Sequence, residues 1–293
     1  MDSGTYLLTK RCNNNCIFCA RAFTEEKNKD SFEQIKKDLL EKKKQGFDSI
    51  IFTGGEPAIH KDFLKVLEFS KALGFEKVSV QTNGRIFSNI SFCEKVVDIL
   101  GDKLDIFLSF HTIDKQVYKE LARTDGFEQT INGIKNLVQL GVNVRTNTVV
   151  MKPNYEDLEG IIEFISNLGV ESKELMWIHP RGRALNNLEK IVPDIREVTP
   201  YLIKAIKKGE QLKGKITLES FPFCATGGYE DYCSENLMGE QMSNSHKIMK
   251  HFGEDCKECD YYKKCPGIWK RYFDIYGFDF RPIDKTNVDN KQI

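Results

Sequence analysis

The sequence predicts an α/β protein with a parallel sheet, followed by a smaller cysteine-rich part. Two observations lead to this prediction. Short apolar runs alternate with amphipathic stretches about six times at spacings of about 30 residues, and most of the cysteines lie near the two ends of the 293-residue chain. Strand, helix, strand order at this spacing favours parallel pairing through right-handed crossovers. The result is either an open doubly wound sheet or a curved part-barrel.

The expected strands are short runs rich in β-branched and aromatic residues, at 5–8, 49–52, 77–81, 105–110, 142–150 and 174–178. The expected helices are amphipathic, and several end at a glycine. They cover residues 32–44, 63–73, 90–100, 130–140 and 158–168. In both candidate folds, the chemistry belongs at the carboxyl ends of the strands.

The pattern changes past about residue 190, where a helix over 199–208 and a short strand over 215–219 precede a segment rich in Cys, Gly and Tyr. We therefore expect three parts. Residues 1–190 form the barrel, residues 191–283 form a C-terminal extension that closes over it, and residues 284–293 form a polar tail.

The charge balance argues against polyanionic partners. Lys and Arg number 43, as do Asp and Glu, so no global field holds a nucleic acid or an anionic membrane. No apolar run approaches the roughly 20 residues of a spanning helix, and no secretion signal is recognised. We expect a cytoplasmic protein, in which nine cysteines indicate metal or redox chemistry rather than disulfides.

The front cysteines, Cys12, Cys16 and Cys19, follow the first expected strand with the spacing C-x3-C-x2-C. Three thiolates on one short loop can hold three irons of a cubane cluster and leave the fourth open for catalysis, whereas a closed cluster takes four. Zinc is the alternative. It would need a fourth nearby ligand, and the next histidine, His60, lies beyond another strand and helix.

With Phe18 directly before the third cysteine, this motif resembles the signature of the radical S-adenosylmethionine (radical SAM) superfamily. The resemblance covers nearly the whole chain and implies a partial (β/α)6 barrel. It implies that Cys12, Cys16 and Cys19 are catalytic ligands of a [4Fe-4S] cluster whose open iron binds SAM, and that Phe18 is among the residues that bind the cofactor. An electron from a flavodoxin- or ferredoxin-type donor would then generate a 5′-deoxyadenosyl radical that abstracts a substrate hydrogen.

A second motif, Thr53-Gly54-Gly55-Glu56-Pro57, follows the second expected strand. The glycines allow the backbone to approach a ligand closely, Pro57 stiffens the exit, and Glu56 can fix the loop by accepting hydrogen bonds. A simple chain reversal is the alternative. The motif is similar to the family's GGE(P) motif, which implies that Gly54, Gly55, Glu56 and Pro57 bind the cofactor.

Polar residues at the later strand ends would face the barrel mouth. The resemblance implies that Ser109 and Asn147 contact SAM or the substrate. His111 is equally compatible with a core position and with a site role. After the sixth strand, Gly182 would allow close approach and Arg183 could bind a carboxylate, unless this segment is a solvated surface loop.

The back motif, Cys256-x2-Cys259-x5-Cys265, has Cys224 upstream. Four thiolates can form a zinc site that staples the extension, or they can hold an iron-sulfur cluster. The arrangement resembles SPASM and twitch domains, which bind auxiliary [4Fe-4S] clusters. The extension has fewer cysteines than full SPASM domains commonly have, so the resemblance implies one auxiliary cluster on these four residues. Cys233 is then an alternative ligand, a passive thiol, or a hydrogen-atom donor in the pocket.

Two further groups of residues have structural interpretations. Cys93 shares helical spacing with Val96, Val97 and Leu100, which predicts a core position. The aromatic segment 269–280 is expected to pack against the barrel, with substrate stacking as the alternative.

The leading functional prediction is radical modification of a ribosomally made peptide. Eleven residues precede Cys12, so we expect leader recognition to come from a separate protein or from direct contacts. A small-molecule dehydrogenase or rearrangement enzyme is the alternative, and a non-catalytic metal-binding module is a third interpretation. A fully ligated auxiliary cluster would accept an electron from a substrate radical, which would make the reaction oxidative.

Overall fold

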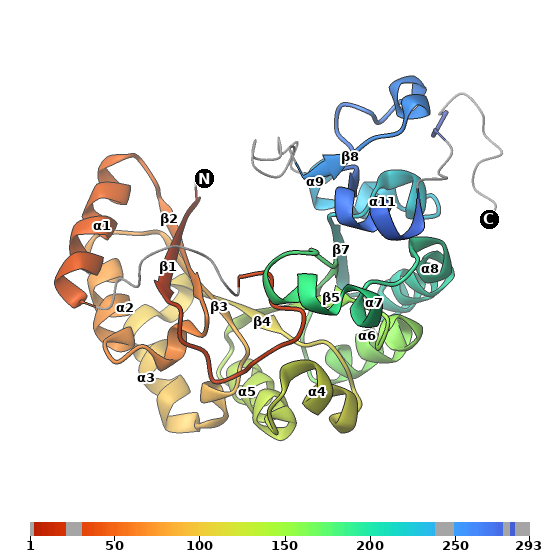
Figure 1. Ribbon diagram of the computed structural model, residues 1–293. Helices are drawn as coiled ribbons and strands as arrows, with labels where there is room; N and C mark the ends of the chain where they lie inside the picture. The colour runs from red at the N-terminus through yellow and green to blue at the C-terminus, as the bar shows by residue number, and fades with distance from the viewer. Residues whose placement is uncertain (1–2, 22–30, 238–248, 278–281, 285–293) are drawn as a thin grey trace.

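The computed structural model describes residues 3–21, 31–237, 249–277 and 282–284. In these ranges one parallel sheet has seven strands in sequential order. Figure 1 shows the sheet curved, with helices covering its convex side and the last part of the chain beyond β7. The strands are β1 (Ser3–Thr9), β2 (Ser49–Gly54), β3 (Lys77–Thr82), β4 (Leu104–Ser109), β5 (Asn143–Val150), β6 (Ser172–Trp177) and β7 (Lys215–Glu219).

The sequential strand order decides between the two folds left open by the sequence. A doubly wound sheet reverses its strand order at a switch point, whereas this sheet runs from β1 to β7 without a reversal. The part-barrel is therefore confirmed, with one strand more than predicted. The segment 215–219, assigned to the extension from sequence, pairs in parallel with β6 from Ser172↔Lys215 to Met176↔Glu219. The division of the chain near residue 190 stays a prediction.

The predicted helices are present, and the glycines expected to end four of them, Gly46, Gly74, Gly141 and Gly169, all have positive φ. Two helices before β7 were not predicted: α4, whose eight residues show little more than two turns of periodicity, and α7, which has four residues. Another, α8, begins four residues earlier than expected, where Asp194 accepts a hydrogen bond from the Arg196 amide. The helices are α1 (Phe32–Lys44), α2 (Phe63–Ala72), α3 (Ile90–Leu100), α4 (Lys115–Ala122), α5 (Phe127–Gln139), α6 (Leu158–Asn167), α7 (Leu188–Ile191) and α8 (Ile195–Gln211).

The core lies between the sheet and the outer helices. On β4, Leu104, Ile106 and Leu108 are buried, while Phe107 between them and Ser109 at the strand end are partly exposed. Successive strand residues point to opposite faces, so Ser109 belongs to the concave face. Cys93 is fully buried in this core, as predicted.

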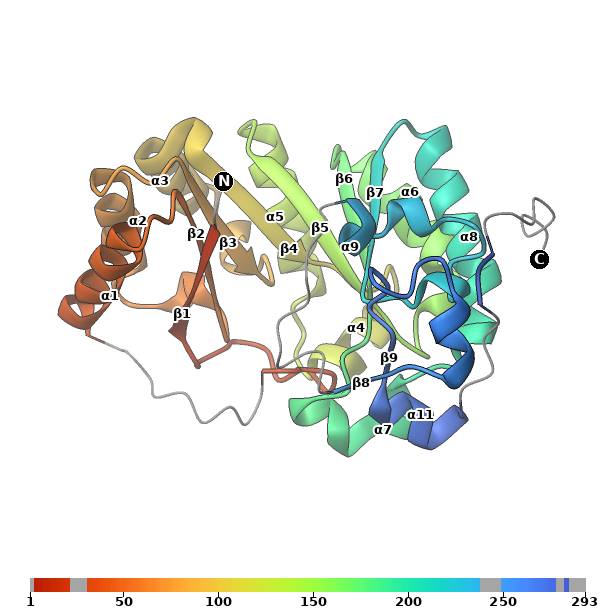
Figure 2. The same ribbon diagram turned by 90° about the horizontal axis from the view of Figure 1, so that it is seen from above.

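The residues after β7 form a smaller unit, which we call the C-terminal unit. It contains α9 (Ser234–Leu237), α11 (Lys270–Tyr276) and the antiparallel pair β8 (Lys250–His251) and β9 (Ile268–Trp269). Seen from above, it lies at the β7 end of the sheet (Figure 2).

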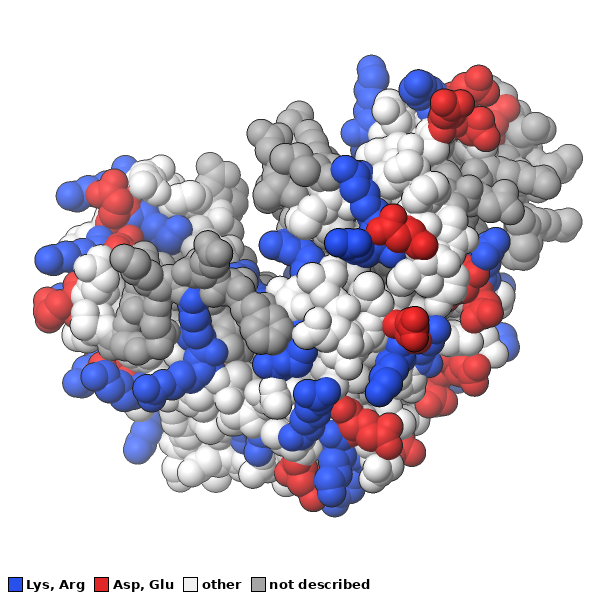
Figure 3. All heavy atoms as spheres, viewed as in Figure 1, with Lys and Arg blue, Asp and Glu red and all other residues white. Residues whose placement is uncertain are grey.

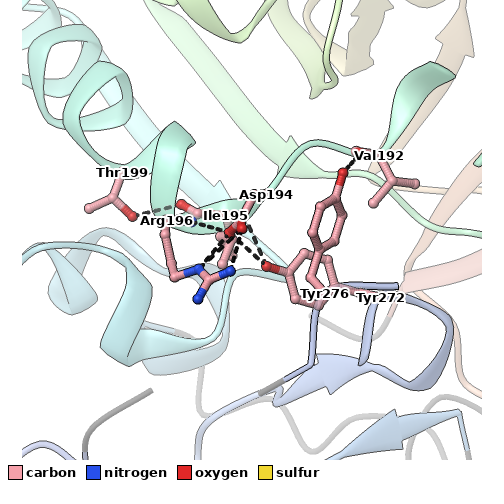
Figure 4. A network of polar contacts seen from close by, with 7 residues as sticks. All are labelled: Val192, Asp194, Ile195, Arg196, Thr199, Tyr272 and Tyr276. Atoms are coloured by element: carbon pink, nitrogen blue, oxygen red, sulfur yellow. Dashed lines mark hydrogen bonds and ion pairs between the residues drawn. The ribbon is translucent and has the colours of Figure 1, made fainter. Parts of the chain in front are cut away.

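Aromatic residues attach the C-terminal unit to the barrel, as predicted for the segment 269–280, since the Tyr272 ring lies 5.9 Å from the Trp177 ring of β6. The Tyr272 hydroxyl donates to Asp194 Oδ1 and accepts from the Ile195 amide, both at 3.1 Å. The Tyr276 hydroxyl donates to the Val192 carbonyl at 2.8 Å (Figure 4). Residues 278–280 of this segment and 285–293 of the predicted tail lie outside the described residues.

No helix in the described ranges is long and apolar enough to cross a membrane. Basic and acidic side chains are interspersed over the face shown in Figure 3, and the molecule is hollowed between the β1 side and the C-terminal unit.

Candidate functional site

A cavity of about 260 Å³, which we call the main cavity, opens at the carboxyl ends of the strands. The thiols of Cys12, Cys16 and Cys19 line it. Residues at the ends of β2, β3 and β4 and after β6 complete it, among them Gly54, Gly55, Asn83, Ser109, His111 and His179. The structure therefore brings the front cysteines, Phe18, both motif glycines and Ser109 to one place.

The cysteine loop, residues 10–20, runs from β1 across the barrel mouth toward α4 and α7 (Figures 1 and 2). The amides of Asn15 and Ile17 donate to the carbonyls of Ala122 and Leu121, each at 2.9 Å. The last carbonyls of a helix have no partner within the helix. The end of α4, the helix missed from sequence, thus supports the cysteine loop.

The segment after β6 also holds the cysteine loop. The Arg183 guanidinium donates to the Cys16 carbonyl at 2.8 Å, and the Arg183 amide donates to the Cys19 carbonyl at 2.9 Å. The Asn187 amide group donates to the Ile17 carbonyl at 3.2 Å. These contacts of Arg183 are thus with the loop backbone, and its suggested role in binding a ligand carboxylate stays a prediction.

Arg85 is a third support, which sequence reasoning missed. Its Nη1 donates to the Asn13 carbonyl and to Asn14 Oδ1, and its Nε donates to Gln129 Oε1 at 2.7 Å. The sequence signal that could have pointed to Arg85 is its position directly after the polar end of β3. Nothing in the local sequence indicates its partners in the loop after β1.

The motif glycines allow a close approach to the protein's own backbone. The Gly55 amide donates to the Thr9 carbonyl, and the Glu56 amide donates to the Arg11 carbonyl, both at 2.7 Å. A Cβ atom would lie 2.2 Å from the Thr9 oxygen at Gly54 and 2.1 Å from the Arg11 oxygen at Gly55. Only glycine fits where β2 meets the start of the cysteine loop.

Glu56 is fully buried and organises the loop after β3. Its carboxylate accepts from the Thr82 hydroxyl and the Asn83 amide, each at 2.7 Å, and from the Ala58 amide at 3.1 Å. Burial raises its pKa to about 6. Glu56 thus fixes the local geometry, as predicted. Glu56 and the buried Pro57 do not line the main cavity, and their contact with a cofactor stays a prediction.

The two histidines of the main cavity differ in chemistry. His111 Nδ1 accepts from the Val149 amide at 3.2 Å, which leaves the hydrogen of the neutral ring on Nε2. The Phe18 ring lies edge-to-face 4.8 Å from it, and burial lowers the pKa of His111 to about 4. His179 instead shares a 3.0 Å hydrogen bond between Nε2 and the Ser220 hydroxyl.

Asn147 does not line the main cavity among the described residues. Its side-chain amide donates to the Glu174 carboxylate on the neighbouring strand. The cofactor contact expected for Asn147 therefore has no support in this geometry, whereas Ser109 lies where it was expected.

The front thiols fit a cationic metal group. Burial and the neighbouring thiols of Cys12 and Cys19 raise the pKa of Cys16 to about 12, so the free thiol stays protonated near neutral pH. A bound metal ion reverses this preference. Cys12 Sγ accepts from the Asn14 amide at 3.3 Å and from Asn83 Nδ2 at 3.8 Å, which are contacts that stabilise a ligating thiolate.

The back cysteines line a second cavity, as the spacing suggested: Cys224, Cys256, Cys259 and Cys265. Cys265 Sγ accepts from the amides of Phe223 and Gly267 at 3.5 and 3.4 Å, and Cys259 Sγ accepts from the Ile283 amide at 3.4 Å. Such N–H donors to sulfur suit an iron-sulfur site. Within the described ranges no three His, Cys, Asp or Glu side chains are arranged to hold a single metal ion.

Cys233 lies elsewhere. It is fully buried, pairs with Leu218 through a backbone bridge, and lines neither cavity among the described residues. The idea that it donates a hydrogen atom in the pocket is therefore corrected, because no substrate in the main cavity would touch it.

A buried lysine lies beside the second cavity. Lys250 is 4% exposed, and its Nζ forms no hydrogen bond in the part of the chain that the structure describes. Nζ lies 3.8 Å from the centroid of the Trp269 ring. Burial lowers the pKa of Lys250 to about 7, while the charges of Glu235 and Cys265 act in the opposite direction.

Comparison with known proteins identifies the family of this chain. The family model of the radical SAM superfamily matches residues 6–165. The probable GTP 3′,8-cyclase of Saccharolobus solfataricus is 34% identical over 208 residues, which cover 69% of this chain and 65% of that relative. The chain thus spans less than two thirds of the length of this curated relative.

Solved structures show the same fold. SuiB of Streptococcus suis bound to S-adenosylmethionine superposes with a TM-score of 0.66 at 16% identity, over 96% of this chain and 76% of that chain. SuiB bound to its precursor peptide SuiA gives 0.62 at 18% identity, over 84% and 54%. The enzyme anSMEcpe with bound AdoMet and the Kp18Cys peptide gives 0.56 at 14% identity, over 96% and 92%.

Proposed function

This chain belongs to the radical SAM superfamily, and from that premise we propose that Cys12, Cys16 and Cys19 hold its [4Fe-4S] cluster and that SAM binds in the main cavity. The observation that carries the proposal is that the three thiols, Gly54 and Gly55 line one cavity at the strand ends. When bound, the cluster and SAM supply an organic radical that removes a hydrogen atom from the substrate. The zinc and non-catalytic interpretations of the front motif lose their support.

The chain's own contribution is to position the cysteine loop. Arg183, Arg85 and the end of α4 hold the loop backbone from three sides. Glu56 secures the loop after β3, whose Asn83 donates to Cys12 Sγ. Ligands held in place in this way require little rearrangement when the metal binds.

For the second cavity we propose an auxiliary [4Fe-4S] cluster on Cys224, Cys256, Cys259 and Cys265. The amides directed at Cys265 and Cys259 support this proposal, as does the buried Lys250, whose charged form is favoured by negative charge on Cys265. Each of the four irons would then have a protein ligand, and no iron would be left open to a substrate. Such a cluster suits electron transfer rather than substrate binding.

We propose a peptide as the substrate. Among the described residues that line the main cavity, Arg21 is the one permanently charged side chain, so the lining suits an uncharged group better than a triphosphate. The resemblance in fold to SuiB and anSMEcpe is compatible with this choice. A small-molecule substrate is the second candidate, favoured by the 34% identity to a probable GTP 3′,8-cyclase.

A cytoplasmic location and a flavodoxin- or ferredoxin-type electron donor complete the proposal. Nine cysteines without a disulfide are compatible with a reducing compartment.

The test is anaerobic. The protein is reconstituted with iron and sulfide, mixed with SAM and dithionite, and assayed for 5′-deoxyadenosine beside a Cys12, Cys16, Cys19→Ala triple variant. We expect the product from the wild type alone. An iron-loaded wild type that neither binds nor cleaves SAM would contradict the proposal. Parallel reactions contain either GTP or short peptides encoded beside the gene. The addition that increases the yield of 5′-deoxyadenosine identifies the substrate class.

A further inference from the structure

The environment of Lys250 carries an inference about the second cavity. Lys250 and Trp269 are paired across the β8–β9 ladder, and Nζ lies over the Trp269 ring at 3.8 Å. The ring face provides a weak attraction for a cation. It provides no hydrogen-bond acceptor, and Nζ finds none elsewhere in the described residues.

A buried ammonium without hydrogen bonds is costly unless negative charge lies nearby. Three groups act on Lys250 electrostatically, namely Glu235, Cys265 and Glu219. Glu235, which is buried and accepts from the Ser220 amide at 2.8 Å, exerts the largest of these effects. Cys265, one of the four thiols of the second cavity, exerts the next largest.

We propose that Lys250 compensates the negative charge of the metal–thiolate group held in the second cavity and thereby raises its reduction potential. This inference rests on the proposed function, in which that cavity holds an iron-sulfur cluster. A thiolate-ligated cluster is anionic and gains further negative charge on reduction. A fixed cation beside it therefore stabilises the reduced form more than the oxidised form, and low-dielectric surroundings strengthen the effect.

The geometry also places this charge near the main cavity. The Trp269 ring contacts both Lys250 Nζ and His179, whose ring centroid is 4.6 Å from that of Trp269. His179 lines the main cavity. The residue that sets the potential of the second group thus lies one aromatic ring away from a side chain that a substrate would meet.

The experiment uses the full chain with Cys12, Cys16 and Cys19 replaced by Ala, so that iron reports on the second cavity alone. This parent protein and its Lys250→Met, Lys250→Arg and Lys173→Met derivatives are reconstituted anaerobically. Iron content is measured, and reduction potentials are determined by titration followed by electron paramagnetic resonance. Lys173 is the matched control, because it is a lysine buried on β6 whose Nζ donates to the Glu171 carbonyl.

We expect Lys250→Met to move the potential to a more negative value, Lys250→Arg to stay near the parent, and Lys173→Met to leave it unchanged. Loss of iron from Lys250→Met but not from Lys250→Arg also supports charge compensation. Equal potentials in the parent and Lys250→Met at equal iron content overturn the inference, and so does loss of iron from both Lys250 variants.

Failure of the proposed function gives a different result. A parent that takes up no iron removes the second cluster and this inference with it. Formation of 5′-deoxyadenosine by the protein with intact front cysteines would still support the first cluster.

Discussion

Arg183 and Cys16 are 167 positions apart in the sequence, yet the Arg183 guanidinium donates to the Cys16 carbonyl at 2.8 Å. This bond joins the segment after β6 to the cysteine loop after β1. It fixes part of the backbone that carries the three thiols lining the main cavity.

Replacing Arg183 by Ala is expected to lower iron binding and SAM cleavage by about 10- to 100-fold, the range typical of residues that orient metal ligands. Iron per protein after reconstitution and 5′-deoxyadenosine yield measure the effect. Arg181→Ala is the matched control, since no side-chain contact with the cysteine loop is seen for Arg181 in the described residues. Equal losses in both variants would speak against the role of Arg183.

Replacing Gly55 by Ala is expected to destabilise the protein by about 1–3 kcal/mol, because the added Cβ would overlap the Arg11 carbonyl oxygen at 2.1 Å. Thermal unfolding of the metal-free protein measures the change. Gly160→Ala in α6 is the control, since its Cβ would meet only the flexible end of Ile113 at 3.3 Å. A Gly55→Ala protein as stable as the wild type would show that the β1 exit can shift.

The Glu56 carboxyl is expected to make stability depend on pH. Its pKa is raised from 4.5 to about 6 in the folded protein, so the folded state holds the proton more tightly. Its contribution is fully present below about pH 4.5 and is lost as the pH rises through about 6, a change of about 2 kcal/mol. Urea unfolding at several pH values should show this decline in the wild type and not in Glu56→Gln.

His111 is expected to give stability the opposite dependence on pH. Its pKa falls from 6.5 to about 4 on folding, so the unfolded state binds the proton more readily. Stability should therefore fall by about 3 kcal/mol as the pH drops from about 6.5 to about 4, relative to His111→Gln. Nitrogen NMR of the ring near pH 6 should show the neutral Nε2–H form, and an imidazolium signal there would contradict the assignment.

The cysteines of the C-terminal unit are expected to differ in iron binding. Cys259→Ala should lower the iron content by about the amount of one cluster, because Cys259 lines the second cavity and accepts an amide hydrogen bond. Cys233→Ala should leave the iron content unchanged, since Cys233 lines neither cavity among the described residues. A loss of iron from Cys233→Ala would make Cys233 the alternative ligand.

Local sequence patterns were sufficient to predict much of the fold and the ligand motifs. Short apolar runs predicted the first six strands, and glycines predicted the helix ends, because these signals depend on neighbours within a few residues. The spacing of Cys12, Cys16 and Cys19 identified the front site for the same reason, since all three thiols lie on one short loop.

The sequence by itself thus determined the succession of strands and helices in a parallel α/β fold, the two cysteine groups and the radical SAM resemblance. Tertiary structure alone decided the sequential strand order that includes β7, the support of the cysteine loop by Arg183 and Arg85, and the place of Lys250 beside the second cavity. Each of these features is a contact between residues far apart in sequence. Such contacts arise from the path of the chain through the folded barrel, and no local periodicity or spacing encodes them.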